Sequence, residues 1–331
     1  MTCLHDEGSE VWIEADYNKS IVEVNMLVAK RLIQSSGRLD VLSHVRGHEA
    51  EAGLPTWAPM WNHRTRVAHS LLGSHVDFCA DGHALPTTTW SNMRADIHKS
   101  EKLGPYHHHF IHEDQLHVTS ISIGRVVWCF KDPAMGHYDE WLGQSDTRRS
   151  LRGPMKYNLS FPRGVLSALA QVETKLPMYT ATQVFEAFGE VLTCGTIHPQ
   201  YEGERGRHEH ASDYVAYRES TIEDLPNAPF PVQDVRPGTR DRAFQNAIDY
   251  ACEGRVLFCT DTGFLGLGPA SLRLGDEACI LRGGKVPYLL REAKEDDYNL
   301  VGECYISGAM HGELVSDSMT DDRKPTKRVI V

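Results

Sequence analysis

The densest group of side chains able to do chemistry is the segment YHHHFIHEDQLH at residues 106–117. In a helix, His108 and His112 would share a face, as metal ligands do, whereas in an extended chain His107 and His109 would. The segment contains no cysteine and no H-E-x-x-H motif, and its two acidic residues lie outside any recognised ligand spacing. We therefore expect no metal site here, and a solvated polar loop is the simpler interpretation.

A neutral imidazole can both donate and accept a hydrogen bond, so a histidine of this segment could polarise a bound substrate. Position in the cluster alone makes candidate catalytic residues of Tyr106, His107, His109 and His112. The tryptophans that could form a substrate-binding wall are Trp57, Trp61, Trp90 and Trp128. Tryptophans are more often part of a core than of a pocket, so burial in the core is the alternative to a role in binding.

Other kinds of site have no sequence signal. There is no G-x-S-x-G motif, and no cysteine stands in a nucleophile signature. The glycine-rich stretch at 263–291 lacks both G-x-G-x-x-G and the P-loop pattern, and strand-like runs rather than helices follow its glycines. Gly275-Asp276 and Gly283-Gly284 indicate tight hairpin turns instead. We expect neither a nucleotide nor any other cofactor.

Composition narrows the class of protein further. The net charge of −11 disfavours nucleic-acid binding, and no apolar run is long enough to cross a membrane. The acidic start of the chain does not resemble a signal peptide, and the eight cysteines are scattered, as in reduced proteins with buried thiols. These features predict a cytoplasmic protein without a membrane span, and they leave its oligomeric state open.

The elements that must position these residues begin with a helix at about 20–36. Ser20 and Glu23 form a capping box, and Gly37 ends the helix. Helical spacing gives this helix one apolar face, made by Ile21, Val24, Val28 and Leu32. In the extended segment that follows, at 53–66, Trp57 and Trp61 are predicted to be buried.

Further helices are predicted at 163–194 and 241–253, and residues 115–130 indicate a strand. Residues 255–331 have the pattern of a β-meander packed on a mixed region at 1–254. The predicted fold class is α+β, with antiparallel β-sheets or a small β-barrel packed with several helices in one compact unit.

Several of these motifs resemble the fungal heterokaryon-incompatibility (HET) domain family. The resemblance is carried by "TDTGFLGLGP", "GGKVPYLLR" and "YNLVGECYISGAMHGE" within 255–313, and upstream by "DYNKSIVEV" and "LPTWAPMWN", where Met60 replaces the usual aspartate. Members of the family normally begin with an α/β signalling domain, and the resemblance implies that this chain lacks it.

The resemblance implies two functions of different class. One is a cofactor-independent cyclase or isomerase of fungal secondary metabolism that acts on an apolar terpenoid or polyketide. A pericyclase such as the norbornene-forming Diels–Alderase of the sordarin pathway would be an example, because it needs only a shaped pocket and a few hydrogen-bond donors. The other is a non-enzymatic regulatory or interaction protein derived from the HET family.

Overall fold

The computed structural model describes residues 16–45, 53–61, 70–73, 77–82, 109–130, 181–195, 254–294, 297–317 and 324–331, and the helical positions 244, 247–248 and 250–252. Its helices are α1 (Ile21–Ser36), η1 (Asp40–His44), η2 (Leu71–Gly73), α5 (Ala181–Thr193) and α8 (Glu313–Asp317). The strands that precede residue 270 are β1 (His109–His112), β2 (Gln115–Phe130), β3 (Arg255–Thr260) and β4 (Leu265–Pro269). The later strands are β5 (Glu277–Leu281), β6 (Pro287–Glu292), β7 (Asp297–Glu303), β8 (Tyr305–Ile306) and β9 (Thr326–Ile330).

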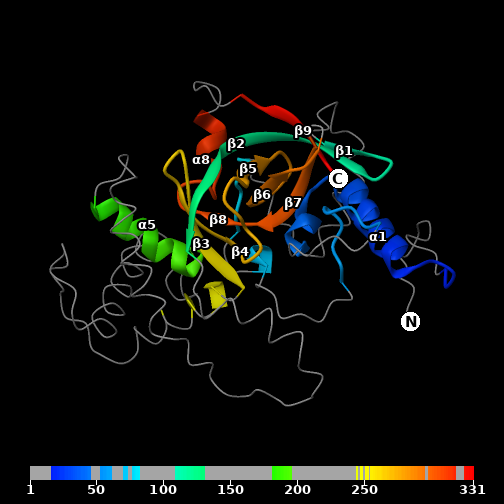
Figure 1. Ribbon diagram of the computed structural model, residues 1–331, viewed down its shortest axis with the longest axis horizontal. Helices are drawn as coiled ribbons and strands as arrows, with labels where there is room; N and C mark the ends of the chain where they lie inside the picture. The colour runs from blue at the N-terminus through cyan, green and yellow to red at the C-terminus, as the bar shows by residue number, and fades with distance from the viewer. Residues whose placement is uncertain are drawn as a thin grey trace, which may run out of the picture.

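Five of these strands close into a ring. β5, β6 and β7 form an antiparallel meander, β9 pairs with β7 in parallel, and β2 pairs with both β9 and β5. β2 arches over the ring in Figure 1. The predicted α+β class with a small barrel and a C-terminal meander is therefore confirmed.

The long strand β2 belongs to two layers. Its first part pairs with β1, β9 and β5, and after an irregularity at Ser122–Gly124 its last part pairs with β3. β3 continues into β4 and β8 and so extends the sheet beyond the ring. Because side chains alternate along a strand, Leu116 and Val118 join the core inside the ring. Ile121 and Ile123 join the second core, between the ring and β3–β4.

The turn between β3 and β4 explains the motif TDTG. Thr260 and Thr262 bond to each other through their hydroxyls, and Thr262 Oγ1 donates to the Ile123 carbonyl at 2.6 Å. Asp261 Oδ1 accepts the Arg125 N–H at 2.8 Å. These residues fix the irregular part of β2, so this motif of the resemblance is explained by folding rather than by chemistry.

Helix α1 begins and ends as the sequence predicts. The capping box of Ser20 and Glu23 is formed, and Gly37 ends the helix in the left-handed conformation at φ 63°. The face that packs on the core differs from the predicted apolar face, because the buried residues are Asn25, Ala29 and Ile33. The small Ala29 lets the helix approach the core closely.

The segment 53–61 packs across the barrel next to the C-terminal strand. Trp57 is fully buried and its Nε1–H donates to the Asp114 carbonyl at 2.8 Å, whereas Trp61 is 41% exposed, so the prediction that it is buried was wrong. Trp57 has both an apolar site and a hydrogen-bond acceptor, which an indole needs for burial. The Thr56 N–H donates to the Val331 carbonyl at 2.9 Å and so links this segment to the end of β9.

Candidate functional site

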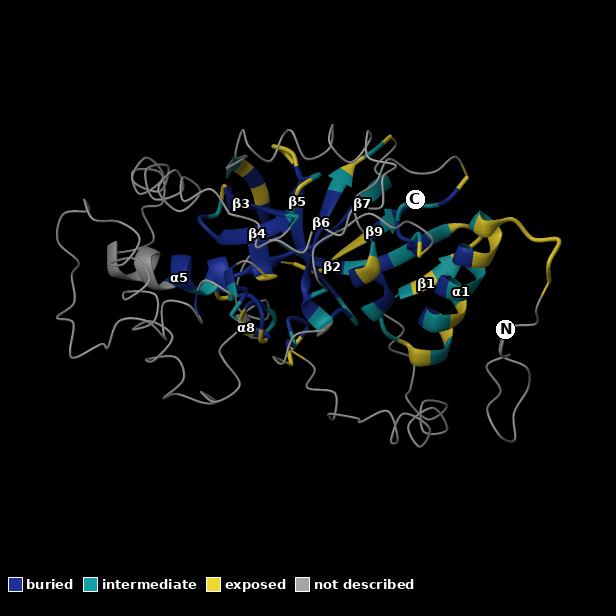
Figure 2. Cartoon of the chain, turned by 90° about the horizontal axis from the view of Figure 1, so that it is seen from below, coloured by how far each residue is buried: buried dark blue, intermediate teal, exposed yellow. Residues whose placement is uncertain are grey.

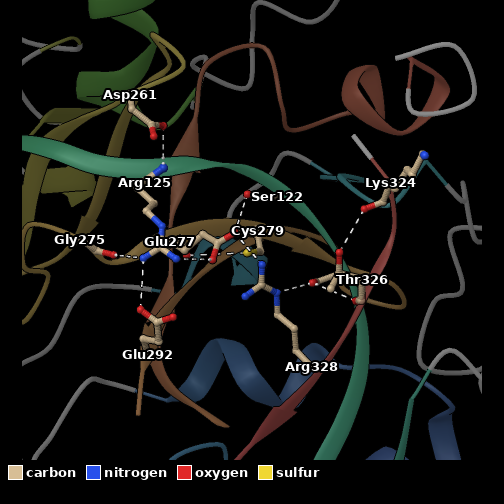
Figure 3. A network of polar contacts seen from close by, with 11 residues as sticks. Ser122, Arg125, Asp261, Gly275, Glu277, Cys279, Glu292, Lys324, Thr326 and Arg328 are labelled. Atoms are coloured by element: carbon tan, nitrogen blue, oxygen red, sulfur yellow. Dashed lines mark hydrogen bonds and ion pairs between the residues drawn. The ribbon is translucent and has the colours of Figure 1, made fainter. Parts of the chain in front are cut away.

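The most concentrated group of polar side chains in the described part of the chain lies inside one end of the ring. This barrel-end network consists of Ser120 and Ser122 of β2, Glu277 of β5, Tyr298 of β7 and Arg328 of β9, with Arg125 and Glu292 at its rim. Figure 3 shows Arg125, Glu277 and Arg328 converging between the strands.

Strand alternation explains why these side chains meet. Glu277 lies on the same face of β5 as the buried Cys279 and Leu281, and Arg328 shares a face of β9 with the buried Ile330. On each of the four strands the network residues lie on the face that points into the ring. Their polar side chains therefore meet at the end of the ring, next to its apolar core.

Arg328 has three partners in the network. Its Nε donates to Ser120 Oγ at 2.8 Å, its Nη2 donates to Glu277 Oε1 at 2.6 Å, and its Cζ lies 4.4 Å from the centre of the Tyr298 ring. Both ends of the ion pair are about 8% exposed. Burial lowers the pKa of Arg328, but Cys279, Glu277 and Tyr298 outweigh it and leave the pKa raised, so this guanidinium stays charged.

Glu277 is shared between the interior and the rim. Its Oε1 also accepts a hydrogen bond from Ser122 Oγ at 2.6 Å, and its Oε2 lies 4.0 Å from Arg125 Nη2. Arg125 is about half exposed, and its Nη1 lies 3.5 Å from Glu292 Oε2. The network therefore alternates positive and negative groups from the interior to the surface, an arrangement that holds polar groups without a large net charge.

A second buried ion pair joins Arg255 and Glu303. Arg255 Nη2 lies 3.1 Å from Glu303 Oε1, which also accepts the Leu71 N–H at 2.7 Å, and Arg255 Nη1 donates to the Ala251 carbonyl. Burial raises the pKa of Glu303, and Arg255 opposes that shift. The pair ties β3 and β7 to η2 and to the helical positions near 251, so its role is to hold elements together.

The predicted catalytic histidines that the structure describes lie on β1, which is extended rather than helical. His109 is half-buried beside Gly283, where an added Cβ would lie 3.1 Å from its imidazole Cε1, and His112 is exposed at the end of the strand. Tyr106 and His107 lie outside the described residues. His109 and His112 therefore lie in different surroundings, and a catalytic role for each of the four candidates stays a prediction.

The predicted substrate-binding tryptophans are spread over the molecule. Trp57 contacts the hairpin between β1 and β2, whereas Trp128 lies near the other end of β2, opposite Cys259. Trp61 is on the surface, and Trp90 is outside the described residues. The described tryptophans do not form one wall, and a role in binding stays a prediction for each.

The cysteines of the described segments are free, and most are buried. Burial raises the pKa of Cys194 to about 12 and that of Cys259 to about 11, and it raises the pKa of Cys279 and Cys304 as well. Because the thiolate is the nucleophile, thiols with such raised pKa values are unreactive at neutral pH. The structure therefore gives these four cysteines a packing role.

No group of three or more His, Cys, Asp and Glu in the described segments could hold a metal ion. None of the helices in these segments is both long and apolar enough to cross a membrane.

The barrel-end network was not predicted from the sequence, because neither Glu277 nor Arg328 belongs to a recognised motif. The side chains of the adjacent Asp276 and Glu277 point apart, since Asp276 binds Arg291 at 2.8 Å and Glu277 binds Arg328. The network could have been predicted from charged residues at inward-facing positions of alternating strands. Glu277 holds such a position in EACIL, and Arg328 holds one in KRVIV.

A closed ring of short strands whose inside is filled by side chains defines a small β-barrel protein. Comparison with known families agrees, because residues 236–324, which contain β3 to β8, match the family described as the Het-6 beta-barrel domain. Heterokaryon incompatibility protein 6, OR allele, of Neurospora crassa is 36% identical over 73 residues, which are 21% of this chain and 11% of that protein.

The chain thus spans only about a tenth of its curated relative's length in this match. No solved structure matches the chain significantly. The two matches support the resemblance of the barrel region to fungal heterokaryon-incompatibility proteins. They give no support to a relation with a Diels–Alderase, which stays a prediction.

Proposed function

We propose that this chain is a non-enzymatic regulatory or interaction protein of the heterokaryon-incompatibility kind. The barrel is its scaffold, and its contact surface is the apolar stripe that Ile21, Val24 and Val28 form on α1. The matches to a Het-6 barrel domain and to a heterokaryon incompatibility protein support the class.

The single observation that carries the proposal is that α1 is firmly held on one face and apolar on another. Its buried face packs through Ala29 and Ile33, and Lys30 Nζ donates to the Glu113 carbonyl at 2.6 Å. Ile21 is nevertheless 58% exposed and Val24 38% exposed. Figure 2 shows exposed positions along α1. Apolar residues at i, i+3 and i+7 of a rigid helix match the side-chain rows of another helix.

The occupant that we assign to this stripe is α1 of a second copy, in antiparallel orientation. Arg31 is exposed toward the C-terminal end of the stripe, and Asp16 lies beyond its N-terminal end, where it pairs with Lys19 at 2.8 Å. An antiparallel two-fold axis brings the same three apolar side chains of both copies together and places Arg31 of one copy toward Asp16 of the other. Three apolar side chains are far fewer than a stable interface uses, so the association is weak and reversible.

Sedimentation velocity of the purified chain over a range of concentrations tests the contact. The wild type should self-associate, and Val24→Glu should weaken association about tenfold or more because it buries an unpaired charge. Gln34→Glu, also exposed on α1 but outside the stripe, is the matched control. A wild type that stays monomeric at all concentrations, or a Val24→Glu variant that associates normally, would contradict the assignment.

The regulatory role needs a separate cellular test, because self-association alone does not define it. Neurospora crassa transformed with the wild-type chain should yield fewer or slower-growing colonies than with an empty vector, and Val24→Glu should restore growth. Equal expression of both chains, measured by immunoblot, is the control. Equal growth in all three transformations would overturn the regulatory role whatever the oligomeric state.

Cyclisation of an apolar intermediate remains the other prediction from the sequence. The described candidates His109 and His112 lie on β1, which pairs with the first part of β2, whereas Trp128 lies near the other end of β2. Incubation with candidate terpenoid or polyketide intermediates, followed by a search for an isomer of unchanged mass, is the test that separates the two.

A further inference from the structure

One nitrogen of the Arg328 guanidinium has no hydrogen-bond acceptor among the described residues. Nε and Nη2 have partners, but Nη1 is buried and has no hydrogen-bond partner among the described residues. The side chain as a whole is more than nine-tenths buried. A buried, charged donor without an acceptor is costly, and such a group in a native protein calls for an acceptor other than the described residues.

The surroundings of Arg328 define what that acceptor can be. Glu277 Oε1 is already shared by Arg328 and Ser122, and the Tyr298 ring covers the flat side of the guanidinium. Leu290, Leu300 and Ile330 belong to the same core inside the ring, so the adjoining wall is apolar. The surroundings of Arg328 therefore combine one free donor of a charged fork with apolar side chains of the core inside the ring.

The charges that face the site sum to zero, so they favour an acceptor of low charge over a dianion or a metal cation. Arg328 and Arg125 contribute two positive charges, and Glu277 and Glu292 contribute two negative charges. A phosphate dianion would leave an excess of negative charge inside the ring, and a metal cation would face Arg328. A carboxylate adds one charge and matches the geometry that guanidinium groups recognise.

We infer that the barrel-end network binds a small carboxylate with a short aliphatic tail, with one carboxylate oxygen accepting from Arg328 Nη1. The tail lies against the apolar wall of the ring, and the half-exposed Arg125 at the rim attracts the acid toward the interior. The site needs no other copy of the chain, so the inference stands apart from the proposed contact along α1.

Sodium propionate is the probe, and propionamide is its neutral counterpart of the same shape. Isothermal titration of the full chain at constant ionic strength should show saturable binding of propionate and none of propionamide. Arg328→Lys keeps the charge but loses the fork, and should weaken binding about tenfold. Lys327→Gln, on the adjacent exposed position of β9, is the matched control and should bind as the wild type does.

A second measurement covers the case in which Arg328→Lys fails to fold. With 13C-labelled propionate, the wild-type chain should give intermolecular NOEs from the ligand methyl group to the Tyr298 ring. Equal titration curves for propionate and propionamide, or no NOE to Tyr298 at saturation, would overturn the inference. A high-resolution crystal structure grown with propionate that shows only an ordered water on Arg328 Nη1 would do the same.

Discussion

Two buried ion pairs of the described core each join strands that are far apart in the chain. Arg328 meets Glu277 across β9 and β5, and Arg255 meets Glu303 across β3 and β7. Removing one partner of such a pair typically costs about 3–5 kcal/mol because the other charge is left buried and unpaired. These residues therefore affect stability as much as any apolar core residue does.

Glu303 should make stability depend on pH. Burial raises its pKa in the folded chain above the ordinary value of 4.5, and Arg255 only partly opposes the shift. The folded state then holds this proton more tightly, so the associated stability is present below about pH 4.5 and is lost as the pH rises through the raised pKa. The free energy of unfolding of the wild type should fall relative to that of Glu303→Gln over this interval.

Urea unfolding of both chains at a series of pH values measures that difference. Glu313→Gln, at an exposed position of α8, serves as the control and should follow the wild type. A wild-type minus Glu303→Gln difference that stays flat, or that rises with pH, would refute the assignment.

At the scale of elements, α1 shows which features local sequence determines. The capping box and the terminal glycine depend on neighbours within four residues, and both were predicted. Which face of the helix packs on the core depends on the barrel, and the positions of the larger apolar residues did not predict that face. Trp61 was mispredicted for the same reason, since burial of a tryptophan depends on what packs over it.

The orientation of α1 predicts opposite outcomes for two neighbouring positions. Ala29 is fully buried, so Ala29→Leu should overpack the core and cost about 1–3 kcal/mol. Val28 is partly exposed, so Val28→Leu should change the free energy of unfolding by less than about 0.5 kcal/mol. Thermal or urea unfolding of the two variants measures these costs. If the face predicted from the sequence packed on the core, Val28→Leu would be the more destabilising of the two.

For the whole molecule, the sequence predicted the class of fold and left a closed barrel as one of two alternatives, without predicting which strands pair to close it. The strand patterns of 115–130 and 255–331 were readable because each is local. Their pairing was not, because Leu116 meets Ile330 only through tertiary contacts. The barrel-end network shares this origin, since Ser120 and Arg328 are 208 positions apart and come together only when the ring closes.

Because β2 lines both cores, the two layers should unfold together. Leu116→Ala removes a side chain from the core inside the ring, and Ile121→Ala removes one from the second core. Each should cost about 2–5 kcal/mol and shift the unfolding midpoint seen by circular dichroism and by tryptophan fluorescence equally. Separate midpoints for the two probes would show that the layers unfold independently.

The late position of β9 in the chain has a consequence for synthesis. β2 leaves the ribosome about 200 residues before the strand that closes the ring beside it, a delay of roughly 10–40 s at about 5–20 residues per second. For the first three quarters or so of that interval β2 has neither β9 nor β5, because β5 (Glu277–Leu281) precedes β9 in the chain, and its apolar inner face and its unpaired backbone groups are open to other chains. The nascent protein therefore depends on chaperones during this interval, and its yield should fall when translation slows between residues 130 and 326.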